Sequence, residues 1–483
     1  MSSTTSRRSF LIGLAAGAVV VGFDPFTRSW VTPAVAAPGL EHVPPLDGEL
    51  LTDPTSLQNA ADDFGHIVHR TPVAVLRPGS INDIVVMVRF CNRHQIPVAA
   101  RGQGHSTFGQ PQVKGGLVID MATLADVRHI GTDRAVVDAG AMWSAVLIDA
   151  LVDRKAPPVL TDYLELSVGG TLSVGGIGGT TFQYGFQVDN VLSLDVVTGE
   201  GRLVTCSTHR NRDLFEAVLA GLGQCALIVR ATVRLVRSTS LVRHYLLNYS
   251  DLATFTSDQR VLIAERRFDF VQGQIVADEA GNWSFVLEAA KYFNRPFESD
   301  ALLDGLHYES EAVIEDLPYF DFQNRLAETV ELLKRIGLWF LPHPWINLFL
   351  PSSAVDDYVS DVLVEFEPED INGPILLYPF WSGRSKRPML QLPDEPVVFI
   401  LAFLRTVIPP GPTVEEMLVS NRDLFEEARD VGGKQYPIGA IPFRRADWVE
   451  HFGDQWRKLV AAKRRYDPNG ILTPGQGIFR PAE

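Results

Sequence analysis

Cysteine is almost absent from this sequence: only Cys91, Cys206 and Cys225 occur among 483 residues. No two of them form a Cys-X-X-Cys pair, and three are too few for the framework of bridges that holds a small secreted domain together. The sequence therefore argues against a disulfide scaffold, a structural zinc site and a redox-active dithiol. His66 and His69 stand three residues apart, but a lone His-X-X-His pair is a weak metal signal, so we predict no metal site.

Positive charge is also in short supply. Lys and Arg number 43 against 58 Asp and Glu, which gives a formal net charge of −15. Because binding to phosphates needs a basic surface, we predict that neither nucleic acid nor an anionic membrane is a partner. With 46% hydrophobic and 21% charged residues, the composition is that of an ordinary globular protein. At about 100–200 residues per domain, the length allows two or three domains.

No run of apolar residues reaches the roughly 20 needed for a membrane-spanning helix. The run at 10–23 follows the twin-arginine segment 6–11 and precedes Ala34-Val35-Ala36, whose small residues suit a cleavage site. This order predicts a twin-arginine signal peptide over residues 1–36. We therefore expect an exported protein, secreted or periplasmic, with no stable membrane insertion after cleavage. An N-terminal anchor that is never cut is the alternative.

From residue 70 the chain alternates between short apolar strands and amphipathic helices, whereas residues 237–429 carry longer helices, scattered aromatic residues and prolines. This change predicts a separate α+β unit in the middle of the chain. We predict strands at 73–76, 98–100, 117–120, 135–138, 191–197, 202–206 and 226–235, and helices at 82–94, 143–153, 213–220, 300–316, 322–336 and 447–465.

Two glycine-rich segments lie beside predicted strands. The first, Gly102-Gln103-Gly104-His105-Ser106, can expose successive backbone N–H groups to a pyrophosphate. The second holds six glycines in residues 169–179, a density that we expect to exclude a packed helix and to suit a backbone lying along a large flat ligand. Neither matches a P-loop or a Rossmann fingerprint. Either alone could be a structural turn, but together they predict a dinucleotide held by other means.

The first glycine segment, followed by Gly109-Gln110, resembles the flavin-attachment loop of the vanillyl-alcohol-oxidase type of FAD proteins. More closely, the chain resembles the cytokinin dehydrogenase (cytokinin oxidase) family, over most of the sequence from about residue 70 to residue 479. The segments that carry this resemblance are 100–110, 161–173, 190–206, 341–349 and 466–476. The runs Pro342-His343-Pro344-Trp345-Ile346-Asn347 and Thr161-Asp162-Tyr163-Leu164 are its most specific parts.

This resemblance implies an α+β fold of two domains with a PCMH-type FAD-binding domain. We expect that domain to be discontinuous, with residues 50–236 and 430–483, and the α+β substrate-binding domain to hold residues 237–429. The implied activity is that of an FAD-dependent oxidoreductase that cleaves the N6 side chain of cytokinins, the N6-substituted adenines. Oxidation gives an imine, which hydrolyses to adenine and an aldehyde. Dioxygen or a quinone-like acceptor would reoxidise the flavin.

The resemblance also implies how FAD is held. A ring nitrogen of His105 would bond the flavin 8α-methyl group, since a neutral imidazole is a competent nucleophile near neutral pH. Gly102, Gln103 and Gly104 would contact the pyrophosphate through their main chain. The remaining expected FAD contacts are Ser106, Gln110, Asp162, Ser167, Ser173, Ile177, Ile228, Tyr436, Thr473 and Gln476.

Asp162 and Gln272 are the expected catalytic residues. The Asp162 carboxylate would accept a hydrogen bond from the substrate N6–H, support the growing positive charge and act as a general base. Gln272 falls where the family pattern has a Glu that bonds the purine, so one acceptor is kept and the charge is lost. Glu279 is an acidic neighbour away from that position. Trp345 and Leu377 would line the substrate side of the pocket, with Tyr378 and Phe380 from the same segment.

Two other interpretations of the sequence stay open. An exported covalent-FAD oxidase of another small alcohol, sugar or amine would share every flavin feature, and Gln272 leaves room for it. A non-catalytic binding protein could use the same scaffold.

Overall fold

The computed structural model describes residues 22–24, 29–31, 41–277, 281–297, 300–309 and 311–479. The predicted twin-arginine segment and the expected cleavage site at 34–36 lie outside these residues, as does Glu279. In the part of the chain that is described, no helix has the length and apolar character needed to cross a membrane.

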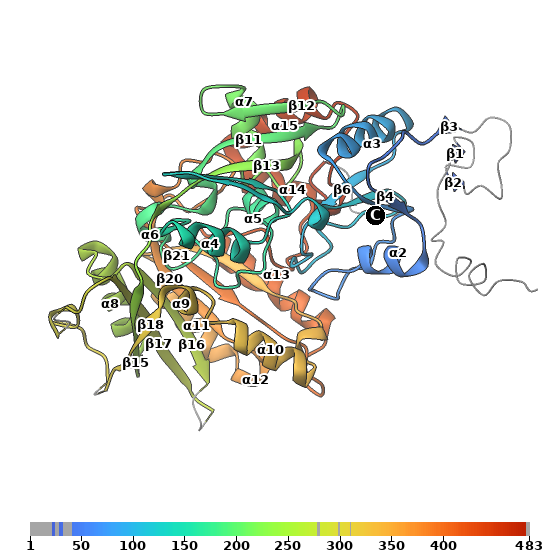
Figure 1. Cartoon of the computed structure of the whole chain (residues 1–483). Coiled ribbons are helices and arrows are strands. Elements are labelled where there is room, and N and C mark those ends of the chain that lie inside the picture. Colours follow the sequence, from blue (N-terminus) through green and yellow to red (C-terminus); the bar gives the residue numbers. More distant parts are fainter. Residues whose placement is uncertain are drawn as a thin grey trace, which may run out of the picture.

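A four-stranded sheet carries the first glycine segment. Its strands β5, β7 and β6 are parallel, and β4 pairs with β5 in the antiparallel sense. The strands are β4 (Glu49–Leu51), β5 (Ala74–Arg77), β6 (Val98–Arg101) and β7 (Leu117–Asp120). Helix α3 (Ile81–His94) begins after Ser80, whose side chain accepts from Asp83 N, and lies beside this sheet (Figure 1). Because β6 ends at Arg101, the glycine segment begins at the carboxyl edge of the sheet.

A five-stranded antiparallel sheet follows, in the order β12-β11-β13-β9-β8. The strands predicted at 191–197 and 202–206 are confirmed and pair at its edge, with Asp195 paired to Thr205 across β11 and β12. The strands are β8 (Val127–Ile130), β9 (Arg134–Asp138), β11 (Val191–Thr198), β12 (Leu203–Ser207) and β13 (Ala226–Arg234).

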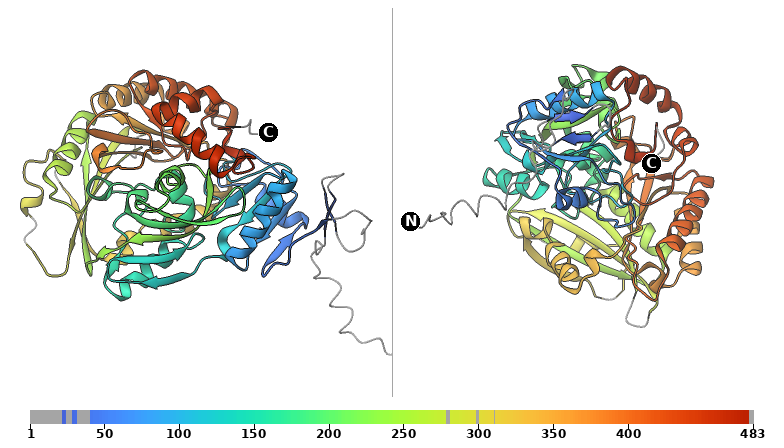
Figure 2. Two further views of the ribbon diagram at one scale, coloured as in Figure 1. Left: turned by 90° about the horizontal axis from the view of Figure 1, so that it is seen from above. Right: turned by 90° about the vertical axis from the view of Figure 1, so that its right-hand side faces the viewer.

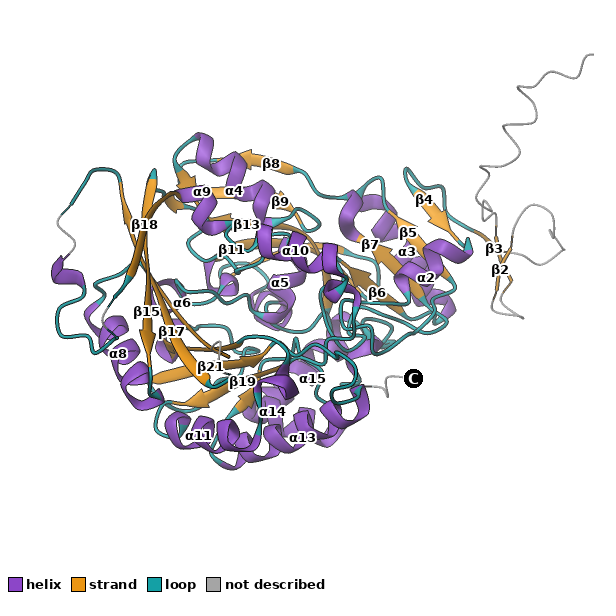
Figure 3. Ribbon diagram, turned by 90° about the horizontal axis from the view of Figure 1, so that it is seen from below, coloured by secondary structure: helices purple, strands orange, loops and turns teal. Residues whose placement is uncertain are grey.

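The middle of the chain forms an eight-stranded sheet in the order β18-β15-β17-β16-β20-β21-β19-β22. Figure 3 shows α8, α11 and α13 along one face of it and α5 and α6 toward the other. The strands are β15 (Leu241–Tyr249), β16 (Phe270–Ala277), β17 (Trp283–Phe293), β18 (Val313–Pro318), β19 (Ile346–Pro351), β20 (Ile375–Trp381), β21 (Val397–Phe403) and β22 (Lys434–Gln435). The other helices are α2 (Pro54–Ala60), α4 (Trp143–Val152), α5 (Val168–Val174), α6 (Thr181–Tyr184), α7 (Arg212–Val218), α8 (Leu252–Glu265), α9 (Tyr319–Gln323), α10 (Ala327–Ile336), α11 (Val355–Glu365), α12 (Pro368–Ile371), α13 (Val414–Asp430), α14 (Arg445–Phe452) and α15 (Trp456–Tyr466).

Two small sheets complete the structure. One pairs β10 (Lys155–Ala156) with β14 (Val236–Arg237). The other joins β1 (Gly22–Asp24), β2 (Ser29–Val31) and β3 (Glu41–His42). The side chain of Phe23 in β1 is 2% exposed, and its ring lies 5.9 Å from that of Phe90 in α3. A segment that the sequence assigns to the signal peptide thus includes residues packed on the folded chain.

Three helix predictions are wrong in part. Of the expected helix 300–316 only Asp300–Leu302 forms a short 3₁₀ turn, and residues 313–316 belong to the edge strand β18, because they pair with β15. Pro318 ends this strand, and an edge tolerates its missing N–H. The expected helix 322–336 is broken between α9 and α10, and the break carries Arg325. The expected helix 447–465 is interrupted at Gly453, which has φ +46°.

The second glycine-rich segment also departs from its prediction, because its first part is the helix α5. Gly169 allows this helix to approach the turn after β9: a Cβ atom there would lie 2.8 Å from the Cβ of Ala139. The helix ends at Gly175 and Gly176, with φ +146° and +75°. The glycines therefore serve close packing of the helix as well as an irregular backbone after it.

The C-terminal segment returns to the N-terminal sheets, and Figures 1 and 2 show α15 in red beside α7 in green. Lys463 Nζ lies 2.7 Å from Asp467 Oδ2 and donates to Gln224 O, and both charged side chains are buried. Asp467 accepts from the backbone N–H groups of Ile471 and Leu472. Since Val98 N of β6 donates to Ile471 O, this buried ion pair holds the C-terminus against the strand that leads into the first glycine segment.

Removal of this ion pair is expected to destabilise the protein strongly. Asp467→Ala leaves the Lys463 ammonium buried and unpaired, so we expect a loss of about 3–5 kcal/mol in the free energy of unfolding, measured by urea denaturation. The matched control is Asp213→Ala, which breaks the exposed pair with Arg465 (2.8 Å) on the same helix and should cost at most about 1 kcal/mol. Equal losses in the two variants would contradict this account.

Candidate active site

A cavity of about 640 Å³ lies where the glycine segments face the large sheet. That volume falls within the range of small-molecule and cofactor pockets. Its walls include every residue that the sequence analysis assigned to the site except Leu377 and Phe380. These residues are Gly102, Gln103, Gly104, His105, Ser106, Gln110, Asp162, Ser167, Ser173, Ile177, Ile228, Gln272, Trp345, Tyr378, Tyr436, Thr473 and Gln476.

Leu377 lies outside the cavity, against the expectation. Its side chain is fully buried in the core, whereas its neighbours Leu376 and Tyr378 in β20 line the cavity. Successive side chains of a strand point to opposite faces, so a shift of one residue decides which of them meets a ligand. Tyr378, named with Leu377 from the same segment, lies in the wall, while Phe380 packs against Phe186 and is not in the wall.

The two glycine segments meet at one point of the wall. A Cβ atom at Gly102 would lie 2.0 Å from Ser167 Oγ, the oxygen that caps α5 by accepting from Gly170 N. Gly104 adopts φ +66°, a left-handed conformation that disfavours other residues. The backbone is thus folded close to the space where the cofactor is expected, and these glycines leave no side chain in the way.

The loop that carries His105 is held by residues 63–65, which the sequence analysis did not single out. Phe64 N donates to Gly104 O (2.8 Å), and Gly65 N donates to Ser106 O (3.2 Å). The buried carboxylate of Asp63 accepts from Gly109 N at 2.7 Å. These bonds fix the loop on both sides of the histidine.

Aromatic rings surround the His105 imidazole. Ring centroids lie 4.2 Å away for Phe64, 5.1 Å for Tyr163, 5.5 Å for Trp345 and 5.7 Å for Trp339. Of these, only Trp345 was predicted to line the site. Tyr163 belongs to a segment that carried the family resemblance, but no pattern in the sequence points to Phe64.

Burial in this cage, with His343 nearby, lowers the pKa of His105 to about 3. The imidazole is therefore neutral at physiological pH and keeps a lone pair on one ring nitrogen. That is the form needed to attack an electrophilic carbon.

Two buried histidines make stability fall with acid. Burial lowers the folded-state pKa of His343 to about 4 and that of His451 to about 3, from an ordinary value of 6.5. As pH falls below 6.5 the unfolded chain binds these protons first, so the native state loses up to about 1.4 kcal/mol per pH unit for each group. His451→Phe is expected to reduce this slope by about that amount between pH 6 and 4, measured by urea denaturation. The exposed His209→Phe should leave the slope unchanged, and an unchanged slope in His451→Phe would contradict the assignment.

These features fit an FAD. The cavity combines a glycine-lined wall with a neutral histidine, and Tyr436 Oη braces its backbone by accepting from Gly176 N at 2.9 Å. Thr473, with φ +49°, donates from Oγ1 to Gly223 O and so closes the same wall from the C-terminal segment. The volume and the glycine-rich lining leave room for a large ligand close to the backbone.

A charged cluster forms another part of the wall. Gln272 Nε2, on β16, donates to both carboxylate oxygens of Asp162 at 3.0 Å. Arg325 Nη2, from the break between α9 and α10, donates to Asp162 Oδ1 at 2.9 Å and to Gln272 Oε1 at 3.0 Å. Asp162 and Gln272 are therefore in direct contact, and Arg325 joins them without a signal in the sequence.

Two further residues complete the cluster. Glu288 is the direct cross-strand neighbour of Gln272 in the β16–β17 pair. Its carboxylate lies 2.7 Å from Arg325 Nε and 2.9 Å from His244 Nε2, and all three side chains line the cavity. The sequence analysis missed both glutamate and histidine; a register prediction for these strands was the only signal that could have placed Glu288.

The carboxylates of this cluster differ in proton affinity. Burial raises the pKa of Asp162, although Arg325 opposes the shift. Burial acts in the same direction on Glu288, but Arg325 and His244 outweigh it and hold its pKa at about 2. Hydrogen bonds and ion pairs with Glu288 and Glu315 raise the pKa of His244 despite its burial. Asp162 is thus the carboxyl group of the cluster better suited to take up a proton.

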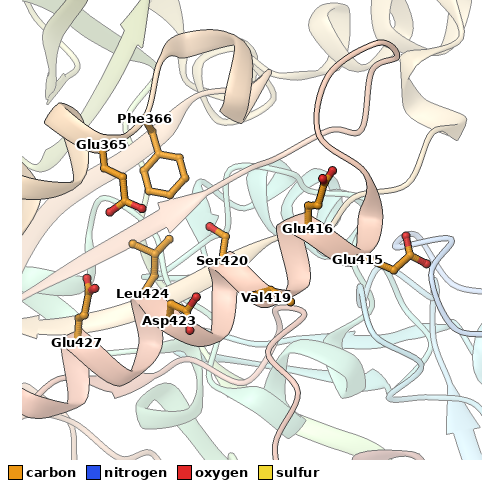
Figure 4. A pocket seen from close by; sticks show the side chains of 9 residues that line it. All are labelled: Glu365, Phe366, Glu415, Glu416, Val419, Ser420, Asp423, Leu424 and Glu427. Atoms are coloured by element: carbon orange, nitrogen blue, oxygen red, sulfur yellow. The ribbon is translucent and has the colours of Figure 1, made fainter.

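Other hollows lie elsewhere. One of about 380 Å³, shown in Figure 4, runs along α13 and is lined by the carboxylates of Glu365, Glu415, Glu416, Asp423 and Glu427. Across the described ranges, no group of three or more His, Cys, Asp and Glu side chains is arranged to hold a metal ion. His66 and His69 share a carboxylate partner in Asp62, at 2.7 and 3.4 Å, which their spacing did not reveal.

Comparison with known proteins gives a consistent result. Residues 277–479 match the family model "Cytokinin dehydrogenase 1, FAD and cytokinin binding", and residues 72–207 match the model "FAD binding domain". The chain is 42% identical to an uncharacterized oxidoreductase, ORF5 in the fasciation locus of Rhodococcoides fascians, covering 88% of this chain and 97% of that protein. It is 37% identical to cytokinin dehydrogenase 9 of Oryza sativa subsp. japonica, covering 88% and 89%.

Among solved structures, 6-hydroxy-D-nicotine oxidase from Arthrobacter nicotinovorans is similar, with a TM-score of 0.69 and 19% identity over 88% of this chain and 96% of that one. At that identity the likeness shows the fold alone. The predicted α+β, two-domain PCMH-type fold is confirmed. The extensive matches to the curated relatives show that the chain belongs to the cytokinin dehydrogenase family of FAD-dependent oxidoreductases.

Proposed function

We propose that this oxidoreductase removes the N6 side chain of N6-substituted adenines by oxidising the carbon next to N6. The observation that carries the proposal is the Asp162 carboxylate, which lies in the same cavity wall as His105 and is held by Gln272 and Arg325. The resulting imine hydrolyses to adenine and an aldehyde. The family match to cytokinin-binding proteins supports this substrate class.

Asp162 acts on the amine. Its carboxylate accepts the N6–H hydrogen bond and so aligns the substrate, and it stabilises positive charge at nitrogen as hydride leaves the neighbouring carbon. The N6 proton then passes to Asp162, whose raised pKa suits a general base. One proton and one hydride leave the amine, which accounts for the C=N bond of the imine. Bound FAD supplies the two-electron acceptor, and dioxygen or a quinone-like compound accepts the electrons afterwards.

We propose that FAD is attached covalently to His105. The neutral imidazole, held by residues 63–65 and enclosed by aromatic rings, supports this role. Backbone groups of Gly102, Gln103 and Gly104 would hold the pyrophosphate. The further contacts proposed for FAD are Ser106, Gln110, Asp162, Ser167, Ser173, Ile177, Ile228, Tyr436, Thr473 and Gln476, all of them in the cavity wall. On the substrate side we propose Trp345 and, in place of Leu377, its neighbours Leu376 and Tyr378.

Export by the twin-arginine route stays a proposal based on the sequence order at 6–36. The domain boundaries, residues 50–236 with 430–483 for FAD and 237–429 for substrate, are likewise proposed. The sheets support this division in the main, since the four- and five-stranded sheets take their strands from residues 49–234 and the strands β15 to β21 of the eight-stranded sheet lie in 241–403. The strand β22 departs from it, because it belongs to 430–483 and joins the eight-stranded sheet.

Anaerobic mixing of the purified yellow protein with a substrate panel tests the proposal. We expect N6-isopentenyladenine to bleach the flavin absorbance, with adenine and an aldehyde released, and simple sugars and alcohols to leave the spectrum unchanged. A flavin reduced by sugars, alcohols or other amines and not by isopentenyladenine would instead support an oxidase of those compounds, the alternative that Gln272 leaves open.

A further inference from the structure

Arg325 has hydrogen-bond donors that the protein does not use. Its Nη2 donates to Asp162, Gln272 and Glu288, and its Nε lies 2.7 Å from Glu288 Oε1. The Nη1 nitrogen has no hydrogen-bond acceptor among the described residues. The side chain is 16% exposed and belongs to the cavity wall. A guanidinium donor in such a site normally finds a partner, and here a ligand can provide it.

The guanidinium is also held in a fixed orientation. Its central carbon lies 4.9 Å from the ring centroid of Phe270 and 5.0 Å from that of Phe322. Glu288 binds one edge of the group, and Asp162 binds the nitrogen next to Nη1. Because the guanidinium is planar and rigid, these contacts place the free Nη1 donors beside the Asp162 carboxylate.

A donor next to an acceptor matches a particular chemical pattern. Adenine presents the N6–H donor beside a ring-nitrogen acceptor, N7 on one edge and N1 on the other, and side chains with one donor and one acceptor read such an edge by paired hydrogen bonds. Asp162 supplies the acceptor and Arg325 supplies the donor. The Gln272 amide donates from Nε2 to Asp162 and accepts at Oε1 from Arg325, so it links these two side chains. Its own groups are therefore occupied, and Arg325 is the residue that can donate to the purine.

We propose that Arg325 is a specificity-determining residue that donates from Nη1 to the purine nitrogen beside N6, while Asp162 accepts the N6–H. The inference rests on the proposed function, since it requires a purine in this cavity. Glu288 and His244 act as positioning residues, because their ion pair holds the guanidinium from the far side. The donor to the purine nitrogen in this chain is thereby Arg325 and not Gln272, whose amide is engaged by Asp162 and Arg325.

Deaza analogues test this contact in the holoenzyme. The dissociation constant and the rate of flavin reduction are measured anaerobically for N6-isopentenyladenine and for its 1-deaza and 7-deaza analogues, in which C–H replaces the acceptor nitrogen. We expect one of the two analogues to bind about ten- to a hundredfold more weakly than the parent, as for loss of a hydrogen bond to a charged donor. Equal binding of all three purines to the wild type would overturn the inference and leave the proposed function in place.

Variants assign the effect to the arginine. In Arg325→Met combined with Glu288→Gln, which leaves no unpaired carboxylate at position 288, the ratio of parent to deaza affinity is expected to fall to about one. Arg325→Gln serves if that protein folds poorly. The control Arg243→Gln removes an arginine paired with Asp316 at 2.7 Å on the same sheet, outside the cavity wall, and should keep the wild-type ratio.

The failures of the two proposals are distinguishable. A wild-type ratio that persists without Arg325 would overturn the role of the arginine alone. A purine that neither binds the wild type nor reduces its flavin would overturn the proposed function, and this inference with it. A general structural role of Arg325 would weaken all three purines equally and leave the ratio unchanged.

Discussion

Replacing His105 with alanine is expected to yield a protein that retains no flavin after acid precipitation. The proposed bond joins a ring nitrogen to the flavin, and alanine has no atom to make it. The backbone of residues 102–106 is held by residues 63–65 through main-chain bonds, so the loop and the cavity should persist. The variant can therefore still bind FAD reversibly and should lose the flavin on denaturation.

The measurement is the absorbance and fluorescence of the washed acid pellet. The control is His209→Ala, an exposed histidine outside the cavity, which should keep its flavin through the same treatment. A yellow pellet from His105→Ala would show that another residue carries the bond.

Asp162→Asn is expected to slow flavin reduction by about 10²–10⁴-fold while the flavin stays bound. The amide is close in size and can still accept from Arg325, but it cannot take the N6 proton or stabilise positive charge at nitrogen. In this variant Arg325 still has the Glu288 carboxylate as an anionic partner, so we expect the protein to fold.

Anaerobic stopped-flow with isopentenyladenine measures this change, and saturation with substrate separates binding from reduction. Asp316→Asn is the matched control, since this exposed carboxylate pairs with Arg243 at the sheet edge and should leave the reduction rate unchanged. A rate in Asp162→Asn close to that of the wild type would remove Asp162 from the mechanism.

Much of the fold follows from local sequence patterns. The strand before His105 and the two strands on either side of residues 199–201 carry strong local signals, and they lie where expected. The segment 313–318 has no such signal: its pairing with β15, more than sixty residues earlier, decides that it is a strand. Gly169 misleads for a similar reason, because its close contact with Ala139 gives a glycine a packing role inside a helix.

The candidate site likewise contains residues that local sequence patterns reveal and residues that only long-range contacts place there. Motif residues such as His105 and Asp162 are recognisable because their chemistry needs particular side chains next to each other in sequence. Arg325 and Glu288 reach Asp162 only through the break after α9 and the register of β16 with β17, and neither is visible in one sequence. Phe64 reaches His105 through a packing contact alone. The prediction for Leu377 is wrong by one residue: its side chain lies in the core, whereas those of its neighbours Leu376 and Tyr378 line the cavity.

Mass spectrometry of the tryptic peptide that spans residues 102–114 tests the central claim most directly. For protein made with ample riboflavin, covalent attachment predicts a peptide heavier by the mass of FAD less two hydrogens, with the added mass located on His105 by fragmentation. Recovery of this peptide at its unmodified mass alone would contradict the account.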